Sequence, residues 1–125
     1  MTRTESNQNI FRFLNWSVYR DAQGLFREIL QLTKKLPAEL NYSLGDQVRR
    51  SALSVALNIA EGSGRGTDKE LNRFFNIAIG SINETVAALD ALHQNGYIEK
   101  TKFDSIFQKL ESISKQLGGF KKQIT

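Results

Sequence analysis

The chain contains no cysteine, and it contains one proline and one histidine in 125 residues. The lack of cysteine excludes disulfides, thiolate zinc sites, iron–sulfur clusters and cysteine nucleophiles, and it fits a reducing cytoplasm. The single histidine, His93, can complete neither the paired Glu-x-x-His motifs of a di-iron bundle nor a Ser-His-Asp triad. Because Asp90-x-x-His93 has no partner motif, we expect no metal, no cofactor and no catalytic residue.

Long apolar runs are also missing. No stretch approaches the roughly 18–20 apolar residues that cross a bilayer, and the polar start MTRTESNQN lacks the apolar region of an export signal. We therefore expect a cytoplasmic protein with no membrane partner. At 125 residues the chain has the usual size of one domain, which we divide into a flexible N-terminal segment, residues 1–12, and a bundle domain, residues 13–125.

The charge is positive overall but unevenly placed. The net charge is +4, from 17 basic and 13 acidic residues, and it permits a weak preference for polyanions. Residues 98–125 carry six basic and three acidic side chains, whereas residues 67–97 carry two basic and four acidic ones. An anion-binding surface is therefore expected to rest on the first and last segments of the chain.

Apolar residues repeat at alternating steps of three and four, which is the spacing of one helix face. The first such stripe runs from Val18 to Leu36, where Pro37 stops it. The second helix is expected to start after Ser43, which we interpret as its N-cap, and to run to about Glu61.

Two further helices complete the pattern. The third opens with the capping box Thr67-x-x-Glu70 and ends at the Asn-Gly pair of residues 95–96, and the fourth runs from Thr101 to Ile124. Four amphipathic helices with short connections predict an all-α fold, an antiparallel up-down-up-down four-helix bundle. The 3-4 spacing favours a left-handed bundle with crossing angles of about 20°.

The connection NIAEGSGRGTDKE, residues 58–70, contains three glycines. A Rossmann fingerprint would follow a strand and a Walker loop would contain a Gly-Lys pair, and neither context is present. We interpret the segment as a sharp turn, with Gly62 at the C′ position of the second helix and the other glycines permitting positive φ. The alternative is an anion site at Arg65 beside a helix N-terminus, where Glu61 would partly neutralise the charge.

Polar residues also gather on the second and third helices. Five share one face of the second helix: Gln47, Arg50, Ser54, Asn58 and Glu61. A second patch lies on the third helix: Gly80, Ser81 and Glu84. Gly80 costs about 1 kcal/mol inside a helix unless a close backbone approach requires it. We expect a structural polar network in which Arg49 or Arg50 pairs with Glu84. A catalytic alternative, with Glu84 or Glu61 as general base, lacks a nucleophile and a cofactor loop.

Nucleic-acid binding would rest on surface cations of the first and last helices and the glycine loop. The candidates are Arg12, Arg20, Arg27, Arg65, Lys109, Lys115, Lys121 and Lys122, and Lys34 and Lys35 extend the first helix's set. A solvated surface explains most of them, and no helix-turn-helix, zinc or RNA-recognition signature is present. Oligomerisation would multiply a weak basic patch into an avid one.

Several of these residues belong to four short sequence motifs: Gln47-Val-Arg-Arg-Ser-Ala-Leu-Ser54, Asn58-Ile-Ala-Glu-Gly62, Gly64-Arg65 and Ala78-Ile-Gly80-Ser81-x-x-Glu84. Their pattern resembles the four helix bundle protein family, also called the 23S rRNA intervening-sequence proteins, over nearly everything after residue 12. The resemblance implies a small bacterial bundle that forms closed homo-oligomers, as five-membered rings. RNA binding is inferred for this family mainly from genetic location. Ala56 stands where family members commonly carry proline, which predicts a straighter second helix here.

These observations favour two functions from different classes. The first is a non-enzymatic, homo-oligomeric bundle that binds ribosomal or other structured RNA, or another nucleic acid, through basic faces. The alternative is a protein-interaction scaffold or accessory subunit with a protein partner and no nucleic-acid binding of its own, like the similar bundles that assist reverse transcriptases. An enzyme whose site is assembled between subunits is a third hypothesis without a supporting motif.

Overall fold

The computed structural model describes the backbone of residues 10–124 and the side chains of residues 10–120. Its elements, in chain order, are η1 (Arg12–Asn15), α2 (Ser17–Thr33), α3 (Ala38–Leu40), η2 (Asn41–Gly45), α4 (Asp46–Ser63), α5 (Asp68–Gln94) and α6 (Lys100–Ile124). The described backbone contains four long helices and no strand, so the predicted all-α fold is confirmed.

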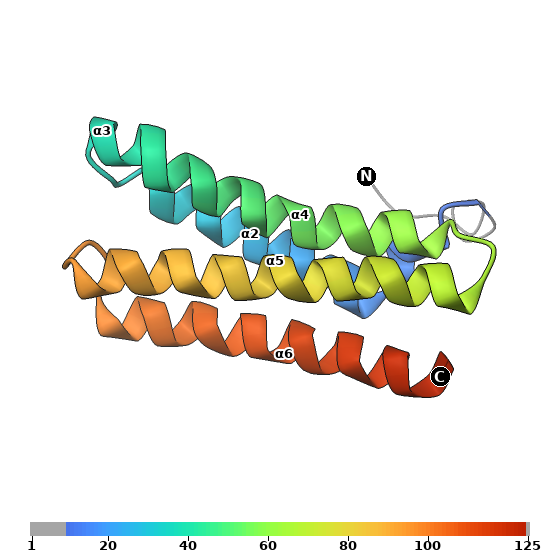
Figure 1. Ribbon diagram of the computed structural model, residues 1–125. Helices are drawn as coiled ribbons and strands as arrows, with labels where there is room; N and C mark the ends of the chain where they lie inside the picture. The colour runs from blue at the N-terminus through green and yellow to red at the C-terminus, as the bar shows by residue number, and fades with distance from the viewer. Residues whose placement is uncertain (1–9, 125) are drawn as a thin grey trace.

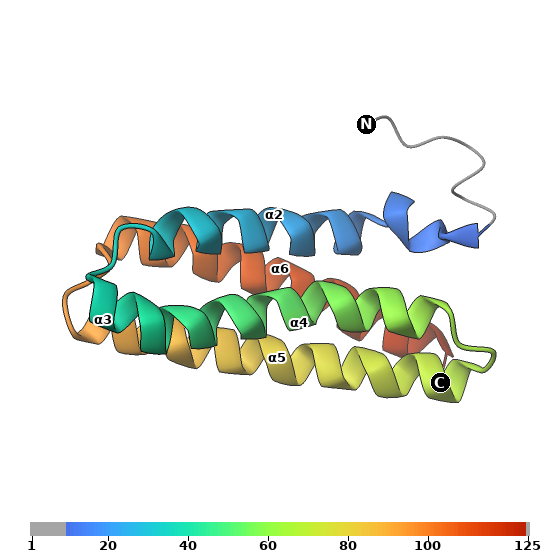
Figure 2. The same ribbon diagram turned by 90° about the horizontal axis from the view of Figure 1, so that it is seen from above.

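The four long helices lie side by side (Figure 1). Each packs against two neighbours, in the cyclic order α2, α4, α5, α6 and back to α2. Figure 2 shows the connection from α2 to α4 and the connection from α5 to α6 at one end, and the connection from α4 to α5 at the other. None of the helices described is long and apolar enough to cross a membrane.

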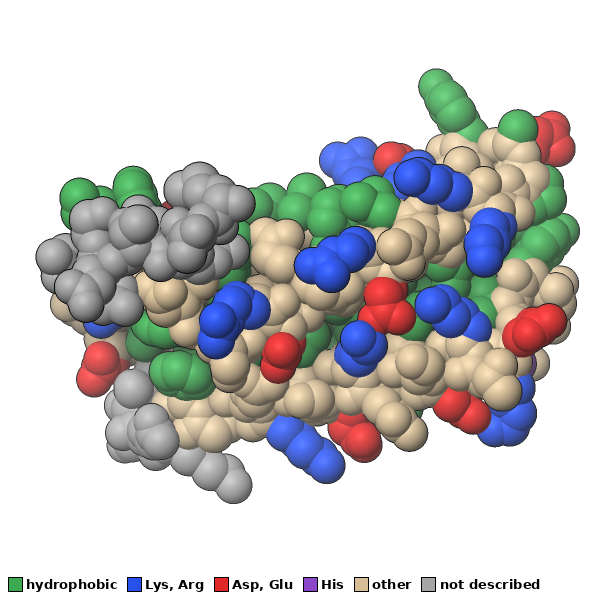
Figure 3. Space-filling model, turned by 180° about the vertical axis from the view of Figure 1, so that it is seen from behind, with side chains coloured by type: hydrophobic (Ala, Val, Ile, Leu, Met, Phe, Trp, Pro, Cys, Tyr) green, Lys and Arg blue, Asp and Glu red, His purple; other side chains and the backbone are tan. Residues whose placement is uncertain are grey.

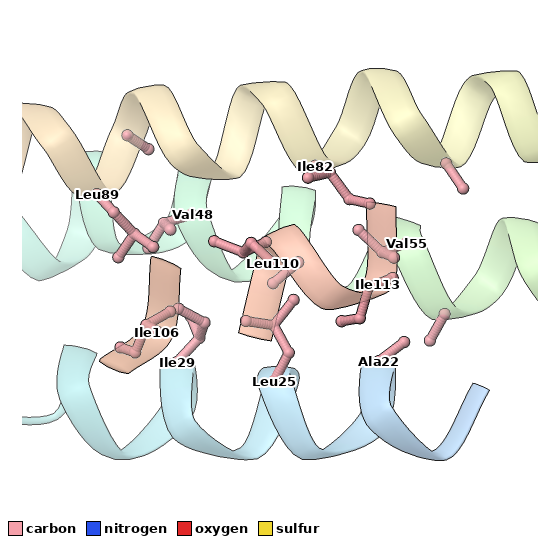
Figure 4. Close-up of a cluster of buried hydrophobic side chains, with 14 of the residues drawn as sticks. Ala22, Leu25, Ile29, Val48, Val55, Ile82, Leu89, Ile106, Leu110 and Ile113 are labelled. Carbon is pink, nitrogen blue, oxygen red and sulfur yellow. The ribbon is translucent and has the colours of Figure 1, made fainter. Parts of the chain in front are cut away.

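The core is built from the apolar positions that the 3-4 spacing marks. Leu25 and Ile29 of α2 lie against Leu110 and Ile106 of the neighbouring helix α6, and Val55 of α4 belongs to the same core (Figure 4). All five side chains are at most 1% exposed. Burial of these stripes, at roughly 25 cal/mol per Å² of apolar surface, supplies the main stabilisation of the fold.

Helix ends follow the sequence in one case and depart from it in another. The Thr67 hydroxyl accepts a hydrogen bond from the Glu70 amide at 3.2 Å, as the capping box predicts. The N-cap assigned to Ser43 is wrong. The chain becomes helical directly after Pro37, and the Ser43 hydroxyl donates to the Glu39 carbonyl inside that helical segment.

The glycine turn is also built differently from the prediction. Gly62 is helical and buried within α4, and a Cβ there would lie 3.1 Å from the Phe74 Cβ, so close helix packing, and not positive φ, favours glycine at this position. Within residues 10–124 positive φ occurs at Gly96 alone, at 83°. At Gly80 an added Cβ would meet nothing within 4 Å, so no neighbouring helix of this chain requires glycine there.

The segment before α2 packs against the end of the bundle. The Trp16 ring lies 6.5 Å from that of Phe75 and 5.5 Å from that of Phe120, measured between centroids. Arg12 opens η1, and its guanidinium donates to the Ser63 carbonyl at 3.0 Å, near the end of α4. Of the N-terminal segment predicted over residues 1–12, residues 1–9 lie outside the described residues.

Candidate nucleic-acid interface

A groove runs between α2 and α6. It is lined by Arg20, Asp21, Gly24, Arg27, Lys109 and Ser112. Three of these, Arg20, Arg27 and Lys109, were predicted as nucleic-acid contacts. Figure 3 shows Lys and Arg side chains spread along this face, with single Asp and Glu side chains between them.

Helical spacing explains why these cations meet. Arg20, Gly24 and Arg27 follow one another at steps of four and three, so they share one face of α2. Gly24 supplies no side chain between the two arginines, and a Cβ there would meet nothing within 4 Å. The groove therefore has an open floor between two guanidinium groups, while Lys109 borders it from α6.

Glu28 of α2 pairs with two lysines of α6, Lys109 in the groove and Lys102 beyond it. Its carboxylate lies 2.7 Å from the Lys109 ammonium and 3.5 Å from that of Lys102, and its side chain is 18% exposed. Burial alone would raise the pKa of Glu28, but the two lysines outweigh it, so the pKa lies below the ordinary value of 4.5. Glu28 is thus held ionised between two cations.

Side-chain hydrogen bonds tie α2 to α6 at the other end of the groove. The Ser17 hydroxyl donates to the Gln116 amide oxygen at 3.0 Å. The Gln116 amide nitrogen in turn donates to the Asp21 carboxylate at 2.8 Å. Asp21 is therefore bound to an amide, and the seam between the two helices is closed by hydrogen bonds at this end.

The other predicted cations lie elsewhere. Arg12 lies over the Trp16 ring, at 5.4 Å from its centroid, and contacts the end of α4. Arg65 pairs with Glu61 at 3.0 Å. Lys115 lines a separate groove between α5 and α6. The side chains of Lys121 and Lys122 lie outside the described residues.

Arg65 also packs on an aromatic ring. Its guanidinium lies 4.6 Å from the centroid of Phe74, and that of Arg73 lies 4.5 Å from the same ring. Arg73 pairs with Glu70, whose pKa is lowered chiefly by the hydrogen bond from Arg73. Each of the two arginines thus contacts one carboxylate and the Phe74 ring.

The polar patches of α4 and α5 meet, but not through an arginine. Ser54 and Ser81 hydroxyls lie 2.8 Å apart, and the Asn58 amide donates to the Ser54 hydroxyl at 3.0 Å. Separately, the Gln47 amide donates to Glu84 at 2.8 Å, near the surface.

The arginines expected beside Glu84 are placed differently. Arg50 has an 80% exposed side chain and lies 3.9 Å from Asp46, one turn earlier on α4. Arg49 instead donates to the Asn41 carbonyl at 3.2 Å. The predicted Arg–Glu84 pair is therefore wrong, because each arginine has a nearer partner on its own segment.

Sequence reasoning missed the most buried polar pair of this interface. The Thr85 hydroxyl donates to the Ser51 hydroxyl at 2.8 Å, and the two residues are 0% and 4% exposed. Both small residues read as ordinary helix positions in the sequence. The available signal was their spacing, since Ser51 lies three residues before Ser54 and Thr85 four after Ser81.

The sequence predicts that His93, the single histidine, has no metal-binding partners. The residues that the structure describes contain no group of three or more His, Cys, Asp or Glu side chains placed to hold a metal ion. The His93 ring stacks on Phe103 at 4.9 Å, and its Nδ1 lies 2.9 Å from the Ile98 carbonyl. His93 therefore fastens the turn between α5 and α6.

Comparisons with known proteins agree with this architecture. A family described as 23S rRNA-intervening sequence protein matches residues 15–119. A solved structure from Bacteroides thetaiotaomicron VPI-5482, described as a protein with unknown function from the S23 ribosomal protein family, is 25% identical, with a TM-score of 0.75. The similarity covers 84% of this chain and 98% of that one. No curated protein matches the chain.

Proposed function

Because the chain belongs to the 23S rRNA-intervening sequence protein family, we propose that it is a non-enzymatic, homo-oligomeric helical bundle that binds structured RNA through the groove between α2 and α6. The observation that carries this proposal is that Arg20, Arg27 and Lys109 line one groove, with Asp21 as the one carboxylate in its lining. Cations in a row neutralise successive phosphates and release their counterions, which drives nucleic-acid binding. A ribosomal RNA ligand would also place the protein in the cytoplasm.

The distribution of charge between the helices supports the same surface. α6 carries six lysines and two acidic residues, whereas α5 carries two basic and four acidic ones. This charge would attract a polyanion to α6, which borders the α2–α6 groove through Lys109 and the α5–α6 groove through Lys115. α2 carries equal numbers of basic and acidic residues. Its two arginines, Arg20 and Arg27, both line the α2–α6 groove, so α2 contributes positive charge at that groove.

The proposed architecture is an antiparallel up-down-up-down bundle with left-handed crossing. Its support is the placement of successive connections at alternate ends (Figure 2) and the 3-4 spacing of the core. The proposed homo-oligomer, a ring of five as the family resemblance implies, would form through α4 and α5. Leu57 and Ile77 on these helices are 56% and 40% exposed, and the exposed Gly80 permits close approach. Such a ring leaves the groove between α2 and α6 free.

The experiment is a nucleic-acid titration of the purified, nuclease-treated protein over a salt series, with its mass determined by light scattering. The proposal expects an oligomer whose affinity for structured RNA falls steeply with salt, at a slope of about −0.9 per neutralised phosphate. An oligomer with no affinity at low salt would overturn RNA binding. A monomer that binds would overturn the ring alone.

A scaffold or accessory subunit is the second candidate. It is favoured by a hollow lined in part by Ile10, Phe11, Leu57 and Phe74, of which Phe11 is 52% exposed. Exposed apolar surface of this kind is typical of a protein-binding site. Retention of a specific partner protein after nuclease treatment at moderate salt, by a protein without RNA affinity, would favour the scaffold.

A further inference from the structure

A hollow lies where the end of α2 meets the start of α6, beyond the basic groove. Resting on the proposed function, we propose that this hollow binds one unpaired nucleotide of the bound RNA, with the base stacked on Tyr97 and its phosphate held by Lys35 and Lys102. RNA-binding proteins commonly recognise unstacked bases on aromatic side chains, with cations on the backbone.

The size and chemistry of the hollow fit a nucleotide. Its volume is about 590 Å³, within the range of small-ligand sites. Its lining combines three kinds of group: apolar side chains, hydroxyls and charges. The lining includes Leu32, Ile98, Tyr97, Thr101, Lys35 and Lys102. Leu32 and Ile98 are 8% and 6% exposed and form an apolar wall, whereas Tyr97 is 49% exposed and available for stacking.

Backbone hydrogen bonds hold the turn that carries Tyr97. The Tyr97 amide donates to the Leu92 carbonyl at 2.9 Å and the Gly96 amide donates to the His93 carbonyl at 3.0 Å. With Gly96 at a φ of 83°, these bonds form a Schellman motif at the end of α5. The ring is therefore presented from a fixed backbone, which lowers the entropy lost when a base stacks on it.

The hollow and the groove border the same two helices, and a pair of lysines seven residues apart on α6 links them through Glu28. Lys102 lines the hollow and lies 3.5 Å from Glu28, and Glu28 lies 2.7 Å from Lys109, which lines the groove. One strand can therefore follow the groove with its phosphates and enter the hollow with its last base. A base inside a duplex is already stacked and paired, so it is not available to Tyr97.

The carboxylate in the lining gives the site an orientation. Glu99 borders the hollow together with Lys35 and Lys102. A phosphate is repelled by Glu99 and attracted by the two lysines, so it lies on the lysine side, whereas Glu99 can accept a hydrogen bond from a base amino group.

The experiment measures fluorescence anisotropy with a labelled single-stranded RNA of about 12 nucleotides and a duplex RNA of the same length. The variants are Tyr97→Leu, Tyr97→Phe and the control Tyr42→Leu, which removes a tyrosine that is 89% exposed in η2. We expect Tyr97→Leu to weaken single-strand binding about five- to tenfold, because it removes one stacked base, and to leave duplex binding unchanged. Tyr97→Phe and Tyr42→Leu should bind both probes as the wild type does.

The outcomes separate this inference from the proposed function. If the wild type binds neither probe, the proposed function fails and the nucleotide site fails with it. If the wild type binds the single strand but Tyr97→Leu binds it equally well, the nucleotide site alone is overturned. An equal loss on the duplex, or the same loss in Tyr42→Leu, also overturns it, since neither is expected from stacking of an unpaired base.

Discussion

Glu28 of α2 and Lys109 of α6 form the shortest ion pair of the α2–α6 groove, with 2.7 Å between Oε2 and Nζ. The same carboxylate reaches Lys102 at 3.5 Å. An incoming phosphate would need the two ammonium groups that Glu28 already holds. The pair therefore joins α2 to α6 in the free protein and competes with the proposed ligand.

Glu28→Gln should strengthen RNA binding. The substitution keeps the size of the side chain and frees two ammonium groups for phosphate, so we expect the Kd at low salt to fall about three- to fivefold, the range of a partly exposed ion pair. Glu111→Gln makes the same change of charge on α6, beside the separate groove between α5 and α6. An equal gain from both variants in anisotropy titrations would show a general charge effect and contradict a specific competition at Glu28.

The stability of the fold should fall with acid through the same residue. The pKa of Glu28 is lowered in the folded protein, because Lys109 and Lys102 outweigh the effect of burial. The unfolded state then binds more protons than the folded state as the pH falls, so this contribution is complete above about pH 4.5 and is lost as the pH falls through the lower folded pKa. Urea midpoints measured from pH 6 to pH 3 should fall less steeply for Glu28→Gln than for the wild type. Parallel curves would contradict the lowered pKa.

Lys109→Ala and Lys115→Ala test which face of α6 meets the RNA. Both remove one positive charge, but Lys109 lines the α2–α6 groove and Lys115 lines the groove between α5 and α6. We expect Lys109→Ala to weaken binding across sequences and to reduce the slope of log K against log salt by about 0.9, the value for one lost phosphate contact. Lys115→Ala should have a smaller effect. If the two variants lose affinity equally, the groove is not the binding surface.

The fold could be predicted from the sequence because the core depends on spacing alone. An apolar stripe on each helix must be buried whatever the detailed rotation of its neighbours, so Leu25 and Leu110 were readable as core. The start of the second helical segment was not readable, since Ser43 has the chemistry of an N-cap but lies inside a helical run that begins after Pro37. The preference of serine for an N-cap position was therefore overridden, because the helical backbone that starts after Pro37 continues through Ser43.

The candidate site could be predicted only in part. Arg20 and Lys109 were identified as cations, but their meeting depends on how α2 and α6 are rotated against one another, which no residue type encodes. Lys102 was missed although it precedes Lys109 by seven residues, a spacing that places both on one helix face. The pairing of Glu28 with Lys102 and Lys109 could not be predicted either, because it depends on how α6 packs against α2.

Two glycine substitutions should change stability in opposite directions. Gly62→Ala adds a Cβ 3.1 Å from that of Phe74 and 3.2 Å from Leu71 Cδ1, so overpacking should outweigh the helix preference of alanine and cost about 1 kcal/mol. Gly80→Ala meets nothing within 4 Å in the helix interior and should stabilise the fold by about 0.5–1 kcal/mol. Chemical unfolding would measure both.

Light scattering of the same two variants tests the proposed ring. If Gly80→Ala folds more stably but no longer assembles, a neighbouring subunit approaches that glycine. If chemical unfolding shows Gly62→Ala to be the more stable of the two variants, the packing between α4 and α5 at Gly62 has room for a methyl group.

The buried pair Ser51 and Thr85 should act as a unit in the interface between α4 and α5. Thr85 donates to Ser51 at 2.8 Å, and Ser51 donates to the Val48 carbonyl at 3.1 Å. Thr85→Val keeps the shape of the side chain but leaves a buried hydroxyl with fewer partners, so we expect a loss of about 1–2 kcal/mol in the free energy of unfolding. Ser51→Ala together with Thr85→Val removes both polar groups, and the double variant should lose less than the sum of the single losses. Additive losses in a urea-unfolding cycle would show that the two hydroxyls act independently and that the helices are held here by apolar packing alone.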